Sequence, residues 1–334
     1  MNPNVSIIIP TYNRRLLIDT TIDNLLRQSL PPHEIIIIDD HSTDDTLNWL
    51  DHKYGNKLIL LPNKDKGPGA ARNTGLKIAS GDYIKFFDSD DLMTQNTLEV
   101  QVNTLKETGK GLVTGPYFYA SEVNGNWISK DNVILNYYNF PQHKPLTHWM
   151  IWGLFIPIPA MLFTHEFIQK TGFWPEEMIT SEDWAYLWNI AMHEPFPAHT
   201  NECAFLYRLH TEQSTGANLN NTQRDKEKYF LLKQIFDLDI VKGHFSIFEK
   251  LLFQNKFYQM ARLTPDPVFK RELFSISGNL PVQKLLWEYF RLKNKFGRIR
   301  TQTNWQSMHG PKSSSILLKD YLKNILSNEY QKTS

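Results

Sequence analysis

Short apolar runs alternate with helix-like segments in the N-terminal part of the chain. Four runs have strand length and carry β-branched or aromatic side chains: VSIII at 5–9, EIIII at 34–38, LILL at 58–61 and YIKFF at 83–87. Between them, residues 15–28, 43–52 and 69–79 space their apolar side chains as helices do. Strands that are apolar almost throughout, each followed by a helix, are typical of a parallel sheet covered on both faces. The sequence therefore predicts an α/β fold with a mostly parallel, nucleotide-binding type of sheet flanked by helices.

The pattern becomes irregular after residue 110 and helical toward the C-terminus. The longest apolar run, WMIWGLFIPIPAMLF at 149–163, contains two prolines and is shorter than the roughly 20 residues of a spanning helix, so we expect it to be buried in protein. The polar stretch GANLNNTQRDKEK at 216–228 indicates a linker. Helical patterns follow, broken at 265–267 and 278–281. We therefore expect a sheet-containing domain over 1–216 and a helical region over 217–334.

Net charge, cysteine content and the N-terminal segment argue against several classes of protein. The net charge of +1 over 334 residues argues against a nucleic-acid-binding protein with a wholly basic surface. The single cysteine, Cys203, cannot form an internal disulfide and lacks the companions of a zinc site. The N-terminus enters the first strand without a basic segment or a long apolar segment, so no export is expected. Together these features predict a cytoplasmic protein.

Polar clusters follow three of the predicted strands directly. They are Thr11 to Asn13, Asp39 with Asp40, and Asp88 to Asp91. Ligands of such sheets bind beyond the carboxyl ends of the strands. We expect the three clusters to meet at one edge of the sheet.

The stretch FFDSDD at 86–91 places three carboxylates together at the end of an apolar strand. Like charges at this spacing repel one another unless a positive charge lies among them. In one interpretation Asp90 or Asp91 caps a helix over 92–105. In the other, Asp88 and Asp90, on either side of Ser89, help to hold Mg²⁺ or Mn²⁺, whose charge also compensates a bound diphosphate. The spacing alone fits both.

Two further segments carry polar groups near the same edge. After Asp39 and Asp40, which could accept hydrogen bonds from a ribose or a base, Ser42 or Thr43 would cap the next helix. The segment GPGAARNTG at 67–75 resembles a dinucleotide fingerprint, but Arg72 replaces the third glycine and the segment follows the third strand. Arg72 could reach a base or a phosphate oxygen, or it could be an ordinary exposed arginine.

Asp183 and His210 are the remaining candidates. In TSEDW at 180–184, the acids fit the first turn of a helix capped by Thr180 or Ser181, or Asp183 is a general base whose pKa the helix N-terminus lowers. His210 is either a surface histidine or a metal ligand that shares a cation with Asp90.

Taken in order, SIIIPTYNR, EIIIIDDHSTDDT, GPGAARNTG, FFDSDD, TGFWPEE, SEDW and YRLHTEQST resemble the family 2 glycosyltransferases, which use the GT-A fold. The resemblance covers residues 4–216. It implies an inverting transfer of a sugar from a nucleotide donor, most often UDP-linked, to a hydroxyl acceptor, with Mn²⁺ or Mg²⁺ as the cofactor.

The resemblance also implies a role for each matching residue. The nucleoside pocket would be lined by Pro10, Tyr12, Asp40 and Arg72, with Asp39 beside them; Asp88 and Ser89 would lie at the ribose and diphosphate; Asp90 would bind the metal; His210 would support the metal or diphosphate; and Asp183 would be the base. The sequence departs from the family pattern in two places. His41 stands where glycine is usual, although histidine tolerates a positive φ less readily, and Trp188 with Asn189 stand where an arginine is common.

Two functions of other classes compete with sugar transfer. A binding module would hold the nucleotide sugar without turnover, and a nucleotidyltransferase would use the same carboxylates for two-metal chemistry. The resemblance makes cell-surface polysaccharide or lipopolysaccharide synthesis the expected setting, with a glycan or lipid-linked acceptor. A basic amphipathic helix over 282–300 would then lie on the inner face of the membrane, or else pack on the catalytic domain or on a partner subunit.

Overall fold

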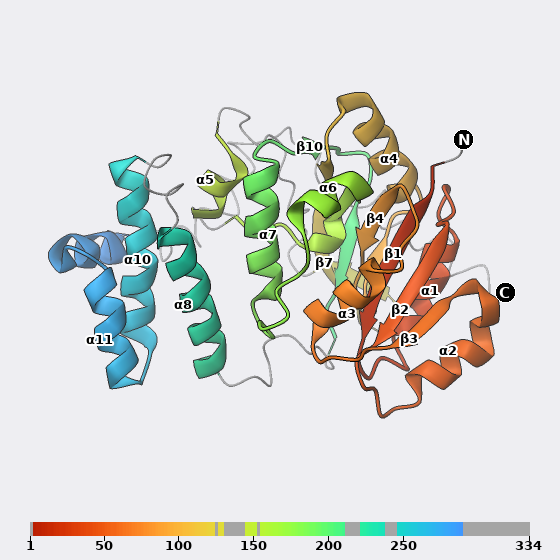
Figure 1. Ribbon diagram of the computed structural model, residues 1–334, viewed down its shortest axis with the longest axis horizontal. Helices are drawn as coiled ribbons and strands as arrows, with labels where there is room; N and C mark the ends of the chain where they lie inside the picture. Colours follow the sequence, from red (N-terminus) through yellow and green to blue (C-terminus); the bar gives the residue numbers. More distant parts are fainter. Residues whose placement is uncertain are drawn as a thin grey trace. The chain divides into compact units, whose positions relative to one another are not determined.

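The computed structural model describes residues 3–123, 126–129, 144–151, 154–210, 221–237 and 246–289 (Figure 1). The chain divides into two compact units. The first contains the sheets and comprises 1–142, 156–213 and 312–334, and the second comprises 143–155 and 214–311. The predicted boundary between residues 216 and 217 lies outside the described residues and stays a prediction.

A seven-stranded sheet forms the centre of the first unit. Its strands are β1 (Val5–Thr11), β2 (Glu34–Asp39), β3 (Ile59–Pro62), β4 (Tyr83–Phe86), β6 (Leu112–Thr114), β9 (Met161–Thr164) and β10 (Ala198–His199). Their order is β10-β6-β9-β4-β1-β2-β3, and β9 runs antiparallel to both of its neighbours. The other pairings are parallel. The prediction of a mostly parallel α/β sheet is confirmed.

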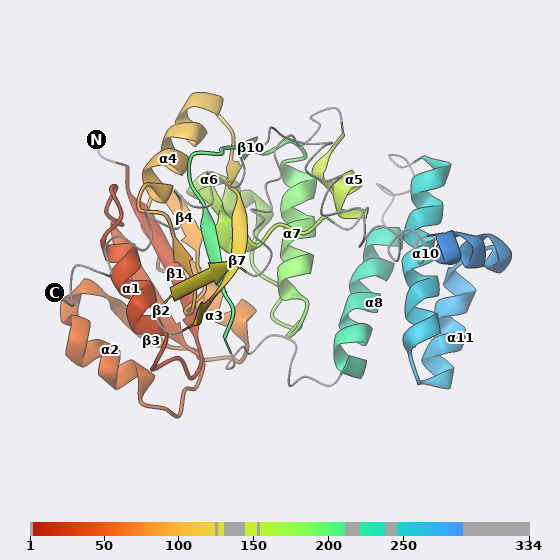
Figure 2. The same cartoon turned by 180° about the vertical axis from the view of Figure 1, so that it is seen from behind.

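Helices cover both faces of this sheet (Figures 1 and 2). They are α1 (Ile18–Leu26), α2 (Thr46–Tyr54), α3 (Pro68–Leu76), α4 (Thr97–Thr108), α6 (His165–Thr171) and α7 (Glu182–His193). Successive side chains of a strand point to opposite faces. Phe86 of β4 contacts Tyr186 of α7, whereas the neighbouring Lys85 donates a hydrogen bond to Gln101 of α4. The sheet is therefore buried on both sides.

Helix α3 approaches the sheet closely, and this approach requires a glycine. A Cβ atom at Gly75 would lie 2.5 Å from Cγ2 of Ile8 and 3.4 Å from Cγ1 of Ile38. Both isoleucines belong to the sheet core, on β1 and β2. The contact fixes α3, and with it Arg72, against the two strands that end at the polar edge.

A second, four-stranded sheet brings a distant segment to the same edge. It contains β5 (Leu92–Met93), β11 (Phe205–Arg208), β7 (Tyr117–Val123) and β8 (Asn126–Ser129) in that order. Strand β11 pairs antiparallel with β5, which directly follows the FFDSDD stretch. The pairing explains how residues 208–210 come to lie beside Asp88 to Asp91.

Three local predictions are wrong. The helix expected over 92–105 begins at Thr97, because residues 92 and 93 form β5, so neither Asp90 nor Asp91 caps it. Helix α2 begins at Thr46 rather than after Ser42 or Thr43, and Oδ1 of Asp44 accepts from the Thr46 amide at 3.2 Å. The polar stretch at 216–228 is helical from residue 221 onward.

The described part of the second unit is helical. Its described helices are α5 (Leu146–Ile151), α8 (Asn221–Asp237), α10 (Ile247–Leu263) and α11 (Pro267–Ile276), followed by a helical segment at 280–289. Ser246 and Glu249 form a capping box at the start of α10, and Glu249 also pairs with His148 of α5. These contacts join α5, which comes earlier in the sequence, to the helical unit.

The segment predicted to be a basic amphipathic helix, 282–300, is described as far as residue 289. Its helix buries Gln283, whose side chain accepts a hydrogen bond from Asn255, and leaves Leu285 and Tyr289 72% and 58% exposed. None of the helices described in the structure combines the length and hydropathy needed to cross a membrane. In the apolar run at 149–163, the described residues contribute to α5, a 3-10 turn (Ile158–Ala160) and β9, as expected for buried protein.

Candidate functional site

The polar clusters that follow β1, β2 and β4 meet at the carboxyl edge of the sheet, as predicted. The Asp40 amide donates to the Thr11 carbonyl at 2.7 Å, which holds the ends of β1 and β2 together. Asn13 then joins the two turns: its amide donates to Ser42 Oγ at 2.9 Å, and its side-chain oxygen accepts from the Thr43 amide at 2.8 Å. Pro10 is half-buried at this edge and Tyr12 is exposed.

The side chains of Asp39 and Asp40 both accept hydrogen bonds from backbone amides. Oδ2 of Asp39 accepts from the Ser42 amide at 3.0 Å, and its buried Oδ1 makes no hydrogen bond to any described residue. Asp40 accepts from the Gly67 amide at 3.0 Å and from Asn63 at 2.8 Å, which fixes the loop before α3. Of the two, Asp39 therefore retains an unsatisfied oxygen that a ligand N–H or O–H could use.

His41 occupies a left-handed backbone conformation, with φ of +66°. The resemblance to the family 2 glycosyltransferases implies a glycine at this position, and the chain keeps the turn despite the side chain. The ring nitrogen Nε2 lies 3.0 Å from the Asp65 carbonyl. The imidazole thus ties the end of β2 to the loop that precedes α3.

Arg72 is buried, so the interpretation of an exposed loop arginine is wrong. Its guanidinium pairs with Asp88 at 3.0 Å and with Glu182 at 3.3 Å, and it lies over the ring of Trp174 with its Cζ 4.3 Å from the ring centroid. Asn73, the next residue, donates to the Trp174 carbonyl at 2.9 Å and accepts from its amide at 2.8 Å. Helix α3 therefore joins the acidic loop after β4 to the start of α7.

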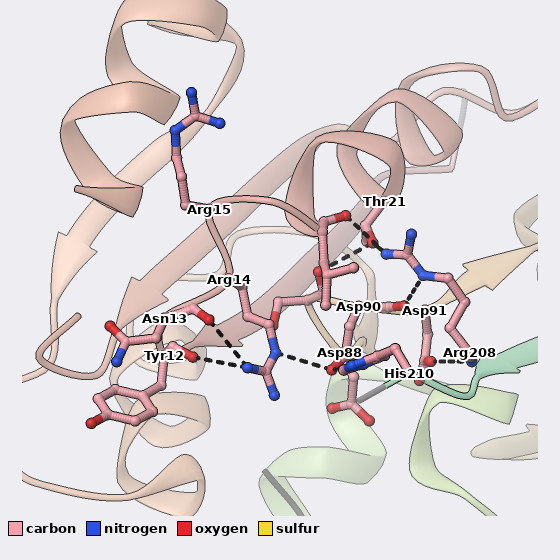
Figure 3. Close-up of polar contacts among 12 residues, drawn as sticks. Tyr12, Asn13, Arg14, Arg15, Thr21, Asp88, Asp90, Asp91, Arg208 and His210 are labelled. Carbon is pink, nitrogen blue, oxygen red and sulfur yellow. Dashed lines mark hydrogen bonds and ion pairs between the residues drawn. The ribbon is translucent and has the colours of Figure 1, made fainter. Parts of the chain in front are cut away.

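Each carboxylate of the FFDSDD stretch has its own partner, which resolves the electrostatic question raised by the sequence. Asp88 pairs with Arg72, and Asp90 pairs with Arg14 at 3.1 Å. Asp91 accepts from the backbone amide of Arg208 at 2.8 Å (Figure 3). The protein itself therefore pairs two of the acids with a guanidinium and gives the third a backbone donor, while the buried Oδ2 of Asp91 makes no hydrogen bond to any described residue.

The side chain of Arg208 holds the backbone of the loop at 88–91 in place. It donates to the Asp90 carbonyl, to the Leu17 carbonyl at 2.9 Å and to Thr21 Oγ1 at 2.9 Å. Thr21 in turn donates to the carbonyl of Ser89 at 3.2 Å, and Ser89 is buried. These bonds fix the loop backbone to α1, so the direction of each acid is set by the fold.

Burial and charge act differently on the three acids. Burial raises the pKa of Asp91 well above its usual value, and the charges of Asp90 and Asp88 raise it further. Burial also raises the pKa of Asp88, against the charge of Arg72. At Asp90 burial opposes ionisation, but the hydrogen bond with His210 and the charge of Arg14 outweigh it and lower the pKa. Asp90 is therefore the acid most strongly held as a carboxylate.

Asp90 and His210 fit a divalent cation. Nε2 of His210 lies 3.1 Å from Oδ2 of Asp90, and adjacent donors of an octahedral site with bonds of about 2.1 Å lie about 3 Å apart. The described residues contain no cluster of three or more metal-ligating side chains. Magnesium-type sites commonly use one or two protein ligands and complete their shell with water and substrate phosphate oxygens. Asp90 and His210 carry the donor atoms that the protein ligands of such a site would need.

Asp183 lies in the first turn of α7, as predicted, and its Oδ1 accepts from the Trp184 amide at 2.7 Å. The predicted lowering of its pKa is wrong. Burial raises the pKa, outweighing the Trp184 amide and the charge of Arg72, while the Asp88 carboxylate raises it further. Burial likewise raises the pKa of the neighbouring Glu182 to about 7, although Arg72 opposes the shift. A raised pKa makes Asp183 a stronger base than the sequence suggested.

The structure also explains the residues where the sequence departs from the family pattern in α7. Trp188 is buried, and Asn189 donates to the Thr171 carbonyl at 2.6 Å at the end of α6. The hydrogen bond of Asn189 fastens α7 to α6.

We predict that Arg72→Met lowers the free energy of unfolding by about 3–5 kcal/mol at pH 8, because Asp88 and Glu182 lose their buried cation. Protonation removes the cost of an uncompensated carboxylate, and Glu182 titrates near pH 7. The loss should therefore shrink at pH 5.5. Urea unfolding at the two pH values measures it.

Arg27→Met is the matched control, because Arg27 pairs with Asp23 on the exposed face of α1. We expect a change within about 1 kcal/mol and no pH dependence of that change. Equal losses in the two variants would show that the buried arginine does not hold the acidic loop and α7 together.

Residues 6–171 match the model of the family described as Glycosyl transferase family 2. The Escherichia coli protein named chondroitin synthase is 31% identical over 232 residues, which is 68% of this chain and 32% of that protein. Another Escherichia coli protein, UDP-Glc:alpha-D-GlcNAc-diphosphoundecaprenol beta-1,3-glucosyltransferase WfgD, is 33% identical over 135 residues, covering 40% of this chain and 53% of that one. The chain thus spans about half, or less, of the length of these relatives.

Among solved structures, S. aureus TarS 1-349 in complex with UDP-GlcNAc superposes with a TM-score of 0.56 at 21% identity, covering 86% of this chain and 92% of that one. This likeness concerns the fold and confirms the GT-A architecture expected from the motifs. The family match over residues 6–171, which include the loops after β1, β2 and β4, identifies the chain as a member of glycosyl transferase family 2.

Proposed function

We propose that the chain transfers a sugar from a nucleotide donor, a UDP-sugar, to a hydroxyl group of an acceptor, with inversion at the anomeric carbon. One observation carries the proposal. Through Arg72, the start of α7 with Asp183 is joined to the acidic loop with Asp88 and Asp90. The proposed base and the proposed site for the leaving diphosphate would thus share one edge of the sheet, as a direct displacement requires.

The donor would bind across the ends of β1, β2 and β4. We propose that Pro10, Tyr12, Asp39, Asp40 and Arg72 form the nucleoside side of the site, and that Asp88 and Ser89 lie at the ribose and diphosphate. The unsatisfied Oδ1 of Asp39 supports a hydrogen bond to the nucleoside. Arg72 would act mainly through its pairs with Asp88 and Glu182, because its guanidinium is buried.

Asp90 and His210 would hold Mn²⁺ or Mg²⁺, which supplies positive charge to a departing diphosphate. Asp183 would accept the proton of the acceptor hydroxyl as that oxygen attacks the anomeric carbon from the face opposite the diphosphate. Its raised pKa supports this role, because it makes proton transfer from the hydroxyl less unfavourable. Arg72 contacts both the acidic loop and the first turn of α7, so it would fix the distance between them during the displacement.

The acceptor that we propose is a glycan or a lipid-linked glycan of cell-surface polysaccharide synthesis. The names of the relatives support this class, since one is a chondroitin synthase and the other uses a diphosphoundecaprenol acceptor. Exposed Leu285 and Tyr289, one helical turn apart and next to exposed Lys284, support a peripheral contact of this helix with the membrane surface.

A donor screen tests the activity. We expect nucleoside diphosphate to be released from a UDP-sugar in the presence of Mn²⁺, faster with a glycan acceptor, and the release to stop with EDTA. Binding of UDP without release under any condition would favour the non-catalytic module, and release of pyrophosphate would favour the nucleotidyltransferase.

Asp183→Asn tests the base. We expect transfer to fall by about 10² to 10⁴-fold while the dissociation constant for UDP stays within about twofold. Because the pKa of Asp183 is raised, the rate of the unaltered chain should decline on the acid side at a higher pH than an ordinary aspartate would give. Glu177→Gln, at an exposed acid six residues earlier, is the control and should behave like the unaltered chain. Full transfer by Asp183→Asn would remove Asp183 from the mechanism.

Sedimentation with lipid vesicles tests the membrane contact. The full chain should bind vesicles that contain anionic phospholipid, and the double variant Leu285→Glu with Tyr289→Glu should bind them several-fold more weakly. Leu263→Glu, at another exposed leucine of the helical unit, should leave binding unchanged. Lack of binding by the full chain would dismiss the contact.

A further inference from the structure

One oxygen of Asp90 has two partners of this chain. Oδ2 lies 3.1 Å from Nε of Arg14 and 3.1 Å from Nε2 of His210 (Figure 3). The side chains of Arg14 and Asp90 are 7% and 19% exposed, so water screens the ion pair weakly. The carboxylate proposed to bind a divalent cation is therefore already neutralised by a cation of the chain itself, the Arg14 guanidinium.

The turn after β1 holds Arg14 in this position. Asn13 adopts a left-handed conformation, with φ of +51°, which asparagine tolerates better than most residues. The Arg14 guanidinium donates through Nη1 to the Asn13 carbonyl at 3.1 Å and the Tyr12 carbonyl at 3.4 Å, and its amide donates to Thr46 Oγ1 at 3.3 Å. An arginine cannot be deprotonated in a protein. The turn therefore keeps a permanent positive charge beside Asp90.

We propose that Arg14 is a built-in counter-ion of Asp90 that opposes binding of a divalent cation until a nucleotide diphosphate arrives. The inference rests on the metal site in the proposed function and adds a residue that controls its occupancy. A guanidinium and a divalent cation repel each other and compete for the same oxygen. The phosphates of a donor relieve the competition, because they offer Arg14 another anionic partner.

The position of the turn supports this coupling. The two carbonyl groups that orient the guanidinium belong to Tyr12 and Asn13, at the edge where the nucleoside would bind. A nucleotide at this edge and a cation at Asp90 would therefore both act on Arg14. By thermodynamic linkage, a nucleotide that strengthens cation binding is itself bound more tightly when the cation is present.

The test measures binding of Mn²⁺ to the full chain by electron paramagnetic resonance of the unbound ion, with and without UDP. Without UDP, Arg14→Met should bind Mn²⁺ roughly tenfold more tightly than the unaltered chain, because a nearby positive charge is gone. The factor by which UDP strengthens Mn²⁺ binding should be several-fold smaller in the variant. Arg14→Lys, which keeps the charge, should resemble the unaltered chain.

Arg15→Met is the matched control. Arg15 is the next residue, but its side chain points away from the acids (Figure 3) and stacks on the ring of Trp49 with its Cζ 3.8 Å from the ring centroid. It should leave Mn²⁺ binding unchanged. Thermal unfolding gives a second readout: Arg14→Met should melt lower than the unaltered chain in EDTA and recover more of that difference when Mn²⁺ is added. Should Arg14→Met not fold, Arg14→Gln provides the same comparison.

Equal or weaker Mn²⁺ binding by the variant, without UDP, would overturn the inference. If the unaltered chain binds Mn²⁺ with UDP and Arg14→Met behaves identically, the metal site stands and the role of Arg14 falls. If neither chain binds Mn²⁺ with or without UDP, both the metal site and the inference fall. Sugar transfer itself is measured separately by the donor screen, so its failure is distinguishable from both.

Discussion

Negative charge at the end of β4 must be balanced by groups from elsewhere in the fold. Three aspartates in four residues follow a buried strand, and two of them form ion pairs with Arg72 and Arg14. These arginines come from α3 and from the turn after β1, and the backbone amide of Arg208 in β11 donates to the third aspartate. An unpaired carboxylate would cost several kcal/mol at this depth. The arrangement of these elements around the acidic loop is therefore an electrostatic requirement as well as a matter of packing.

The same ion pairs connect the parts that a transferase would use together. Arg72 contacts the acidic loop and the first turn of α7 at once, and Trp174 supports it from one side. Trp174 also stacks on Tyr186 of α7, with ring centroids 4.0 Å apart. The first turn of α7 therefore cannot move far without disturbing the pairing of Asp88. A rigid link of this kind fixes the spacing between a base and a leaving group.

The sequence predicts the sheet well because its strands are continuous apolar runs, such as EIIII at 34–38. The segments between them space their apolar side chains as helices do. The sequence also predicts that Asp40 and Asp88 approach one edge, because each follows a strand there, whereas only the family resemblance implied that Asp183 belongs to the same site. It misses the pairing of Arg14 with Asp90 and of Arg72 with Glu182, since these partners are 76 and 110 positions apart. No local pattern encodes such contacts. The sequence predicts a lowered pKa for Asp183, whereas the pKa is raised, because burial by distant elements outweighs the helix N-terminus.

His41 has a further consequence for the edge at which the nucleoside would bind. Its backbone keeps the left-handed geometry that a glycine would adopt freely, and its ring reaches the Asp65 carbonyl. The left-handed conformation costs conformational energy in a residue with a side chain. In return, the side chain links the end of β2 to the loop before α3, a link that a glycine could not make. We therefore expect the end of β2 and the loop before α3 to move together more closely than they would with a glycine at position 41.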